Sequence, residues 1–259
     1  MTVTAQNLVW KIGRKTIVDG VSFEVPPGQT LGLLGPNGSG KTSLLRLLSG
    51  LRKPHEGRVL LDGEAVLDMP RKRLAQRVAF VEQHASTTAN LRVIDVVKLG
   101  RFPHRSFLSG WTAEDERSVE EAMKRTSIDH KRNDGWQHML GGERQRAHIA
   151  RALAQNPREL FLDEPTNHLD IHQQLALMDL VHSLPITKVL AIHDLNQAMR
   201  CDRLAVMYNG RLHAIGTPQQ VLTQELMRDI FQVQADELTD PADGARVLRF
   251  RSLPGQAAA

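Results

Sequence analysis

The chain lacks the features that mark secreted or membrane-spanning proteins. It has one cysteine, Cys201, which excludes an internal disulfide and fits a reducing compartment. No apolar run approaches the roughly 20 residues that a membrane-spanning helix needs. The first residues, Met1 to Gln6, do not form the basic and then apolar segment that is typical of a secretory signal. These absences predict a soluble, cytosolic protein.

A strong charge of either sign is also missing, because the formal net charge is only +4. This excess is compatible with a nucleic-acid or membrane-surface partner, but an ordinary solvated surface explains it equally well. The chain has 259 residues, of which 41% are hydrophobic. That length suffices for one large α/β domain, or for one domain with an inserted lobe.

What the chain does contain is a glycine-rich stretch that fits the pattern G-x-x-x-x-G-K-[ST] at every fixed position. Its residues are Gly35, Pro36, Asn37, Gly38, Ser39, Gly40, Lys41 and Thr42. A predicted buried strand over 30–34 precedes it, and a leucine-rich predicted helix over 43–49 follows. Glycines let backbone N–H groups turn toward an anion, and the helix N-terminus adds further N–H groups. We therefore predict a nucleotide site rather than a flexible turn, with Lys41 on the β- and γ-phosphates and Thr42 on Mg²⁺.

The surrounding pattern predicts an α/β core. Residues 7–25 alternate like paired strands, and further strands are predicted at 58–61, 78–81, 159–162 and 188–192. From about Leu91 to Ala154 the pattern is mostly helical, with a capping box at Thr112-x-x-Asp115. We expect one domain over 1–239, in which a helical subdomain over about 85–155 is inserted. The tail over 240–259 is expected to be partly disordered.

Two acidic residues come at the end of one predicted buried strand. Asp163 and Glu164 follow Phe161-Leu162, and in a phosphate-loop fold that end of the strand faces the nucleotide. Asp163 is predicted to hold Mg²⁺, and Glu164 to be the general base that polarises the attacking water. Taken alone, a strand that happens to end in acidic residues is also a reasonable interpretation.

Three other polar features stand at predicted element ends. Gly141-Gly142-Glu143-Arg144-Gln145-Arg146 opens a helix through Ala154, and glycines at a helix N-terminus provide a second anion site. Gln83 and His193 each end a predicted strand. Taken singly, the glycine pair is more often a plain helix start, and each of the other two is more often a satisfied polar residue.

Together these motifs resemble the ATP-binding subunit of an ABC transporter. They occur in that family's order and at about its spacing: Gly35–Thr42, Gln83, Gly141–Arg146, Asp163–Asp170 and Ile192–Asp194. The resemblance covers roughly residues 6–230. Within the family, the stretches 163–172 and 141–153 are similar to the branch that powers bacterial import of iron-siderophore, haem or cobalamin complexes.

The resemblance implies a phosphate-loop NTPase core with an N-terminal antiparallel β subdomain and an inserted helical subdomain. It also implies that two copies face head to tail around two ATP molecules. Each ATP would lie between one copy's phosphate loop and the other's trans loop, which comprises Gly141, Gly142 and Glu143. Asp170 would connect the two sites, and His193 would hold the γ-phosphate and orient water against Glu164.

The resemblance further implies where the subunit works. Gln83 would contact Mg²⁺ or water and relay its state to the helical subdomain, which docks on an integral-membrane permease. An external substrate-binding protein would deliver the cargo to that permease. The subunit would therefore be peripheral, on the cytoplasmic face of the inner membrane, and would not act on nucleic acid. ATP binding would close the dimer and hydrolysis would reopen it.

One position departs from the family's pattern in a way that bears on catalysis. The family's trans loop usually reads Leu-Ser-Gly-Gly, whereas this chain has Met139-Leu140-Gly141-Gly142. Leu140 has no donor for the γ-phosphate, and one hydrogen bond to a charged group contributes about 1.5–3 kcal/mol. We therefore predict slowed hydrolysis with ATP binding retained.

A second departure concerns the adenine base, which the family often stacks on an aromatic residue from the first strands. Ile12 stands about where that aromatic residue is expected. Trp10, two residues earlier, is the candidate that remains, although a tryptophan buried in the core is the commoner case.

Two other functions compete with the importer subunit. Leu140 favours an ATP-binding regulatory module with little hydrolysis, whereas intact Lys41, Asp163, Glu164 and His193 oppose it. A soluble ABC ATPase acting on DNA or ribosomes is disfavoured. Repair members carry a very long coiled-coil insertion and ribosomal members carry two cassettes, and neither feature occurs in this sequence.

Overall fold

The computed structural model describes residues 2–82, 90–106, 110–167, 169–242, 244 and 246–253. Its central sheet has the strand order β10-β9-β3-β8-β7-β6, which is parallel except for β10. The bounds of these strands are β3 Thr30–Leu34, β6 Val78–Val81, β7 Glu159–Asp163, β8 Thr187–Ala191, β9 Arg203–Tyr208 and β10 Arg211–Gly216. Every residue of β3, β7 and β8 is buried, as their continuous apolar sequence predicts for parallel strands covered on both faces.

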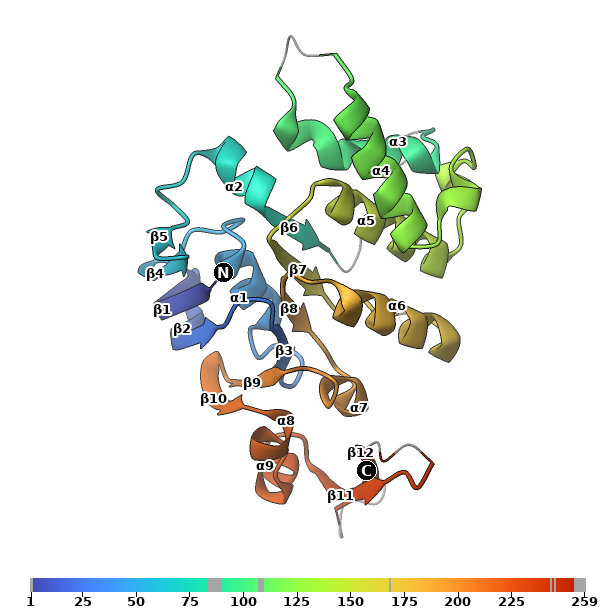
Figure 1. Ribbon diagram of the computed structural model, residues 1–259. Coiled ribbons are helices and arrows are strands. Elements are labelled where there is room, and N and C mark those ends of the chain that lie inside the picture. Colours follow the sequence, from blue (N-terminus) through green and yellow to red (C-terminus); the bar gives the residue numbers. More distant parts are fainter. Residues whose placement is uncertain are drawn as a thin grey trace.

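A separate antiparallel sheet is built from the N-terminal part of the chain. Its order is β2-β1-β4-β5, with β1 Val3–Ile12, β2 Lys15–Val25, β4 Glu56–Leu61 and β5 Glu64–Ala65. Figure 1 shows this sheet beside the central one, with α1 (Lys41–Leu48) next to it. The alternation over 21–25 is confirmed, because Val21, Phe23 and Val25 are buried and the residues between them are exposed.

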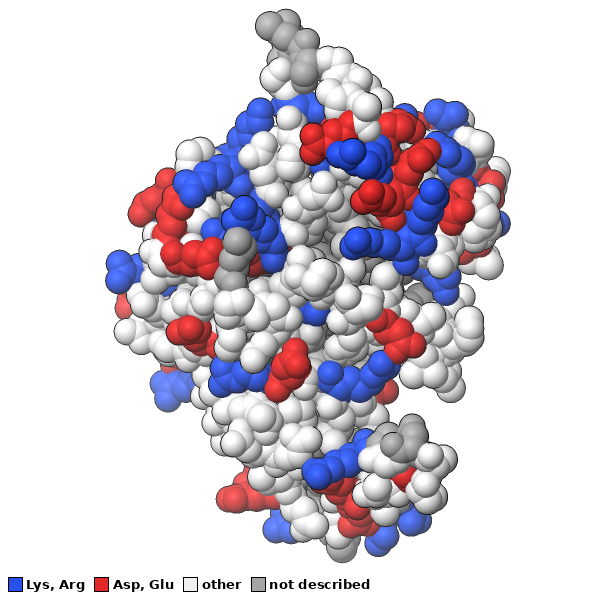
Figure 2. Space-filling model, in the orientation of Figure 1, with Lys and Arg blue, Asp and Glu red and all other residues white. Residues whose placement is uncertain are grey.

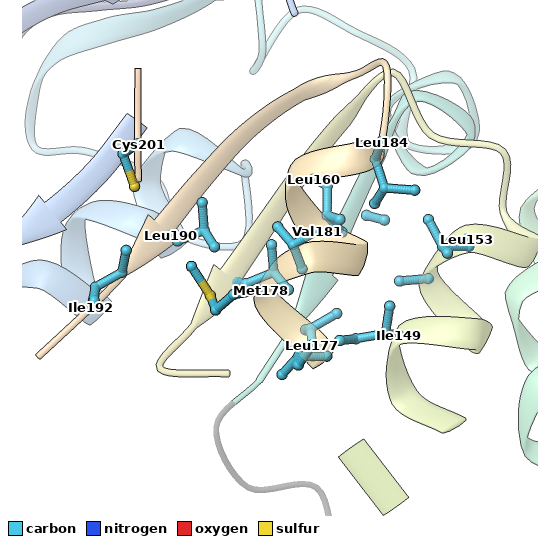
Figure 3. Close-up of a cluster of buried hydrophobic side chains, with 14 of the residues drawn as sticks. Ile149, Leu153, Leu160, Leu177, Met178, Val181, Leu184, Leu190, Ile192 and Cys201 are labelled. Carbon is cyan, nitrogen blue, oxygen red and sulfur yellow. The ribbon is translucent and has the colours of Figure 1, made fainter. Parts of the chain in front are cut away.

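Two hydrophobic clusters lie on opposite faces of the central sheet. Phe161, Val189 and Ala191 share one cluster with the leucines of α1 and the antiparallel sheet. The alternate residues Leu160 and Leu190 pack into the other cluster with α5 (Gly141–Ala154) and α6 (Ile171–Ser183). Figure 3 shows α6 pressing its apolar side chains, such as Leu177, Met178 and Val181, between the sheet and α5. Successive side chains of these strands point to opposite faces of the sheet, so α1 packs on one face and α5 and α6 pack on the other.

The helical subdomain is the uppermost part of Figure 1. Before α5 it consists of α3 Val93–Lys98, η1 Leu99–His104, α4 Ala113–Arg125, η2 Asp129–Lys131 and η3 Trp136–His138. The predicted capping box is confirmed, because Thr112 Oγ1 accepts from the Asp115 N–H and the Asp115 carboxylate accepts from the Thr112 N–H. Asp115 also pairs with buried Arg101 at 2.8 Å, and Arg101 donates to the Ala154 carbonyl at 2.9 Å. This buried pair joins η1, α4 and the end of α5.

The remaining helices are short. They are α2 Arg71–Arg77, which leads into β6, then α7 Leu195–Ala198, α8 Pro218–Val221 and α9 Gln224–Asp229. Across the described residues, we find no helix with the length and apolar character needed to cross a membrane. Figure 2 shows Lys and Arg interspersed with Asp and Glu on the visible face, without a continuous basic surface.

The end of the chain differs from the prediction. The expected boundary at residue 239 falls inside a hairpin, because β11 (Val233–Thr239) pairs with β12 (Arg246–Ser252). Ala235 and Leu248 face the core from the two strands and are only 6% and 7% exposed. The sequence pattern missed β12 because arginines interrupt its apolar residues and only Leu248 among them is buried.

Candidate functional site

The phosphate loop connects β3 to α1, and its glycines are required by backbone geometry. Gly35 and Gly40 have φ angles of 140° and 103°, which side chains rarely adopt. A β-carbon at Gly35 would lie 2.1 Å from the Met207 carbonyl oxygen, and one at Gly40 would lie 2.7 Å from that of Ile17. The loop is therefore held close to the backbone of β9 and β2.

Lys41 is the first residue of α1 and is 5% exposed. Its Nζ donates to the Gly35 carbonyl at 2.8 Å and to the Pro36 carbonyl at 3.2 Å. Burial lowers the pKa of Lys41, although the carboxylates of Glu164 and Asp163 oppose that shift. The ammonium group is thus held by two neutral carbonyl groups of the loop, which negatively charged phosphate oxygens could replace.

Thr42 and Asp163 meet at the carboxyl end of β7, as the sequence predicted for a magnesium site. Thr42 Oγ1 donates to Asp163 Oδ1 at 2.9 Å. Burial raises the pKa of Asp163, which is 3% exposed, and the nearby Glu164 charge adds to that shift. Hydroxyl and carboxylate oxygens are hard ligands of the kind Mg²⁺ prefers, and a nucleotide-bound Mg²⁺ needs only one or two from the protein. The donor set fits the ion.

Glu164 lies between β7 and the turn that follows, in a left-handed backbone conformation with φ of 50°. Its Oε1 contacts Nε2 of His193, which follows β8, and its Oε2 accepts from Asn167 Nδ2 at 2.6 Å. The Glu164 side chain is 13% exposed and that of His193 is 36% exposed. The two predicted catalytic residues are therefore adjacent, just beyond the carboxyl ends of the neighbouring strands β7 and β8. Asn167 is a contact that the sequence did not single out.

The predicted trans loop lies at the start of α5, across the sheet from α1. Leu140 is the N-cap of α5, and its side chain is 68% exposed. Its N–H donates to Glu143 Oε2 at 2.9 Å, but leucine has no oxygen to complete a capping box. Gly142 is buried, and a β-carbon there would lie 2.3 Å from Oε1 of Gln173 in α6. Gly142 therefore lies against α6, and α6 itself is capped by Asp170, whose Oδ1 accepts from the Gln173 N–H at 2.8 Å.

Two further sequence candidates remain predictions. Gln83 lies outside the described residues. Trp10 is half-buried against the N-terminal core, with the Arg52 guanidinium 5.7 Å from its ring centroid, whereas Ile12 is 58% exposed. The structure therefore leaves an aliphatic side chain, rather than an aromatic one, as the more accessible group on that strand.

A family model for ABC transporters matches residues 18–167, which is more than half of the chain. The chain belongs to the ABC transporter family. It is an ATP-binding subunit of that family and an ATPase, with the α/β core, N-terminal antiparallel sheet and inserted helices that the resemblance implied. The predictions of family, fold class and enzyme class are thus confirmed.

Curated relatives of this ABC subunit include import proteins of similar length. The chain is 37% identical to the ferric enterobactin transport ATP-binding protein FepC of Escherichia coli (strain K12) over 244 residues, which are 92% of this chain and 90% of FepC. It is 40% identical to the hemin import ATP-binding protein HmuV of Pseudomonas aeruginosa over 238 residues, which are 88% of this chain and 92% of HmuV.

Solved structures of ABC proteins share the fold. A chain of an inward-facing ABC transporter described as of the metal-chelate type matches with a TM-score of 0.84 and 25% identity, covering 98% of both chains. The dimeric bacterial ABC cassette MJ0796 matches with a TM-score of 0.74 and 27% identity, covering 83% of this chain and 98% of that one.

Proposed function

We propose that this chain binds and hydrolyses ATP for a membrane ABC importer of iron-siderophore, haem or cobalamin-type cargo. The observation that carries the proposal is the grouping of Lys41, Thr42, Asp163, Glu164 and His193 around one phosphate loop. The ferric enterobactin transport named for FepC and the hemin import named for HmuV support the cargo class.

The residues divide the chemistry as follows. The N–H groups of 35–42 and the Lys41 ammonium bind the phosphates, and the start of α1 favours their negative charge. Thr42 and Asp163 would hold Mg²⁺ together with Gln83, and the bound ion would supply positive charge that offsets the charge of the phosphates. Glu164 accepts a proton from the attacking water, and His193 orients that water against Glu164 and holds the γ-phosphate.

A second copy of the chain completes each site in this proposal. Because α5 packs on the face of the sheet opposite α1, we assign Gly141, Gly142 and Glu143 to the nucleotide of a partner copy. Asp170 lies beside this region at the start of α6, and its exposure suits a contact between the copies. The dimeric state of the MJ0796 cassette supports the pairing of two copies, and the head-to-tail orientation is part of the proposal.

The permease would dock where the helical subdomain, about 85–155, meets the core. A groove of about 390 Å³ lies there, and its lining is mostly apolar, including Leu51, Leu74, Phe80 and Pro103. Phe102 is 65% exposed near the groove, as expected for a side chain that a partner covers. Docking there would place the chain on the cytoplasmic face of the inner membrane, with the external substrate-binding protein acting only through the permease.

One observation favours the alternative of a regulatory ABC module with little hydrolysis. The exposed Leu140 side chain stands where the family's serine would reach the γ-phosphate. In this alternative, ATP would still bind and close the dimer, but turnover would be slow.

The test is steady-state ATP hydrolysis as a function of protein concentration. Native chain, Leu140→Ser and a Glu164→Gln blank are compared at saturating Mg²⁺ and ATP. The importer proposal expects native turnover above the blank, rising cooperatively as dimers form. Native turnover equal to the blank, with an active Leu140→Ser, would instead support the regulatory module. Loss of activity in both would contradict the assignment of the site.

A further inference from the structure

Two hydrogen-bonded amide side chains, one buried and one partly buried, link the segments next to Glu164, His193 and Asp170. Gln197 in α7 donates from Nε2 to Oε1 of Gln174 in α6 at 3.1 Å. Gln197 is 8% exposed and Gln174 is partly buried. Because unpaired polar groups are costly in such surroundings, each hydrogen bond of this pair constrains what it contacts.

The pair holds the turn that follows Glu164. Gln197 Oε1 accepts from the Thr166 hydroxyl at 3.2 Å, and Thr166 is 9% exposed. Gln174 Nε2 donates to the Thr166 carbonyl at 3.3 Å and to the Leu169 carbonyl at 3.1 Å. The turn therefore has both of its ends fixed by side chains from two helices. One end lies two residues after Glu164, and the other lies one residue before Asp170.

The same pair reaches the His193 side of the site through α7. Asp194, directly after His193, caps α7 by accepting from the N–H groups of Asn196 and Gln197 at 2.8 and 3.2 Å. The Asn196 side chain bonds both backbone groups of Leu248 in β12, at 3.2 and 2.7 Å. These hydrogen bonds fix α7 to the C-terminal hairpin. They therefore also fix the position of Gln197, which hydrogen-bonds to the turn.

We propose that Gln174 and Gln197 are positioning residues that keep Glu164, His193 and Asp170 in register. This inference rests on the proposed function, in which Asp170 meets the partner copy and Glu164 acts on water. Movement of Asp170 at the interface would then shift Glu164 as well, because the turn between them is held by side chains and does not deform independently. Neither glutamine contacts the phosphate loop, so their loss should reduce turnover without weakening ATP binding.

The test removes the hydrogen bonds with side chains of similar size. Gln174→Leu, Gln197→Leu and Thr166→Val should each lower kcat about tenfold, which is roughly 1.4 kcal/mol in activation free energy, and leave KM for ATP within about twofold. Thr166→Ser keeps the hydroxyl donor and should retain turnover. Gln219→Leu, at an exposed glutamine in α8, is the matched control. The double variant of Gln174 and Gln197 should lose no more than either single variant, because the three groups act as a unit.

A structural readout separates this inference from the proposed function. Amide hydrogen exchange over 164–170 should accelerate in Gln197→Leu relative to native chain and Gln219→Leu, with a melting temperature that shows the variant is folded. Unchanged exchange there, or kcat within twofold of native in all three variants, would overturn the inference. If native turnover equals the Glu164→Gln blank, hydrolysis as the proposed function fails, while the exchange measurement still decides whether the pair positions the turn.

Discussion

The two halves of the proposed nucleotide site, the phosphate loop and the start of α5, differ in how well their residues match the expected role. At the phosphate loop, the β-carbon clash at Gly35, the Lys41 hydrogen bonds and the Thr42–Asp163 contact all agree with one task. At the start of α5, an exposed leucine occupies both the N-cap and the position expected to face a phosphate. The phosphate-loop half thus keeps every residue expected of it, whereas the departure from the family pattern falls in the half that we propose acts on a partner copy. Binding and turnover can therefore be separated by mutation.

The largest expected effect comes from Glu164→Gln in the cis half. Removing the general base should lower turnover by about 10²–10⁴-fold, while ATP affinity changes little because the phosphate contacts remain. Single-turnover hydrolysis and equilibrium nucleotide binding measure the two quantities. Asn167→Ala, which leaves the carboxylate in place, is the comparison variant, and its loss should be much smaller. Turnover in Glu164→Gln close to native would mean that another group takes the proton.

Two glycine-to-alanine substitutions test whether the phosphate loop tolerates a β-carbon. Gly35→Ala should abolish measurable ATP binding, because its methyl group would meet the Met207 carbonyl oxygen at 2.1 Å. Gly38→Ala is the matched control. Gly38 also has positive φ, at 77°, but a β-carbon there meets nothing within 4 Å. The control should cost only the backbone strain of about 1–3 kcal/mol. Titration with a fluorescent ATP analogue measures binding, and melting curves show whether both variants are folded. Equal ATP affinities for the two variants would contradict this account.

The weaker half is tested by restoring its cap. In the absence of nucleotide, Leu140→Ser should stabilise the chain by about 1 kcal/mol, because serine can accept from the N3 N–H of α5. That gain corresponds to a rise in melting temperature of roughly 2–4 °C. Thermal unfolding of Leu140→Ser and Leu140→Ala measures it. Alanine removes the bulk of leucine without adding a cap, so equal melting temperatures for the two variants would show that capping is not the cause.

The smallest effect concerns the buried carboxyl of Asp163. Burial raises its pKa, so the folded nucleotide-free chain holds this proton at pH values where the unfolded chain has released it. Stability contributed by this group is therefore lost as pH rises from the ordinary value of 3.8 through the raised pKa. Asp163→Asn should remove this dependence, and its melting temperature relative to native should increase across that window. A difference in melting temperature between native chain and Asp163→Asn that stays constant as pH changes would contradict the assignment.

The same contrast explains what could be predicted from the sequence. The sequence predicted that Lys41, Thr42, Asp163, Glu164 and His193 would lie together, because a phosphate loop and the carboxyl ends of parallel strands bring residues together by topology. The structure shows that grouping, and the role of each residue stays a prediction. Asn167, Gln174 and Gln197 were missed, since each is an ordinary polar residue until the fold sets it beside the turn. The hairpin strand β12 was missed for a related reason. This segment forms a strand because it pairs with β11, and its own charge-rich sequence does not predict that strand.

Sequence alone determined the order of strand, glycine-rich loop and helix, and with it the nucleotide class and the family. These features are local, because the φ angles that glycine permits and the spacing of apolar residues act within a few positions. Tertiary structure decided that α5 and α1 lie on opposite faces of the sheet, and that Leu140 is exposed at a helix start. It also decided that buried Gln197 and partly buried Gln174 hydrogen-bond to the turn between Glu164 and Asp170. Those outcomes depend on which hydrogen-bonding groups become buried next to one another, and burial is settled only when distant segments pack.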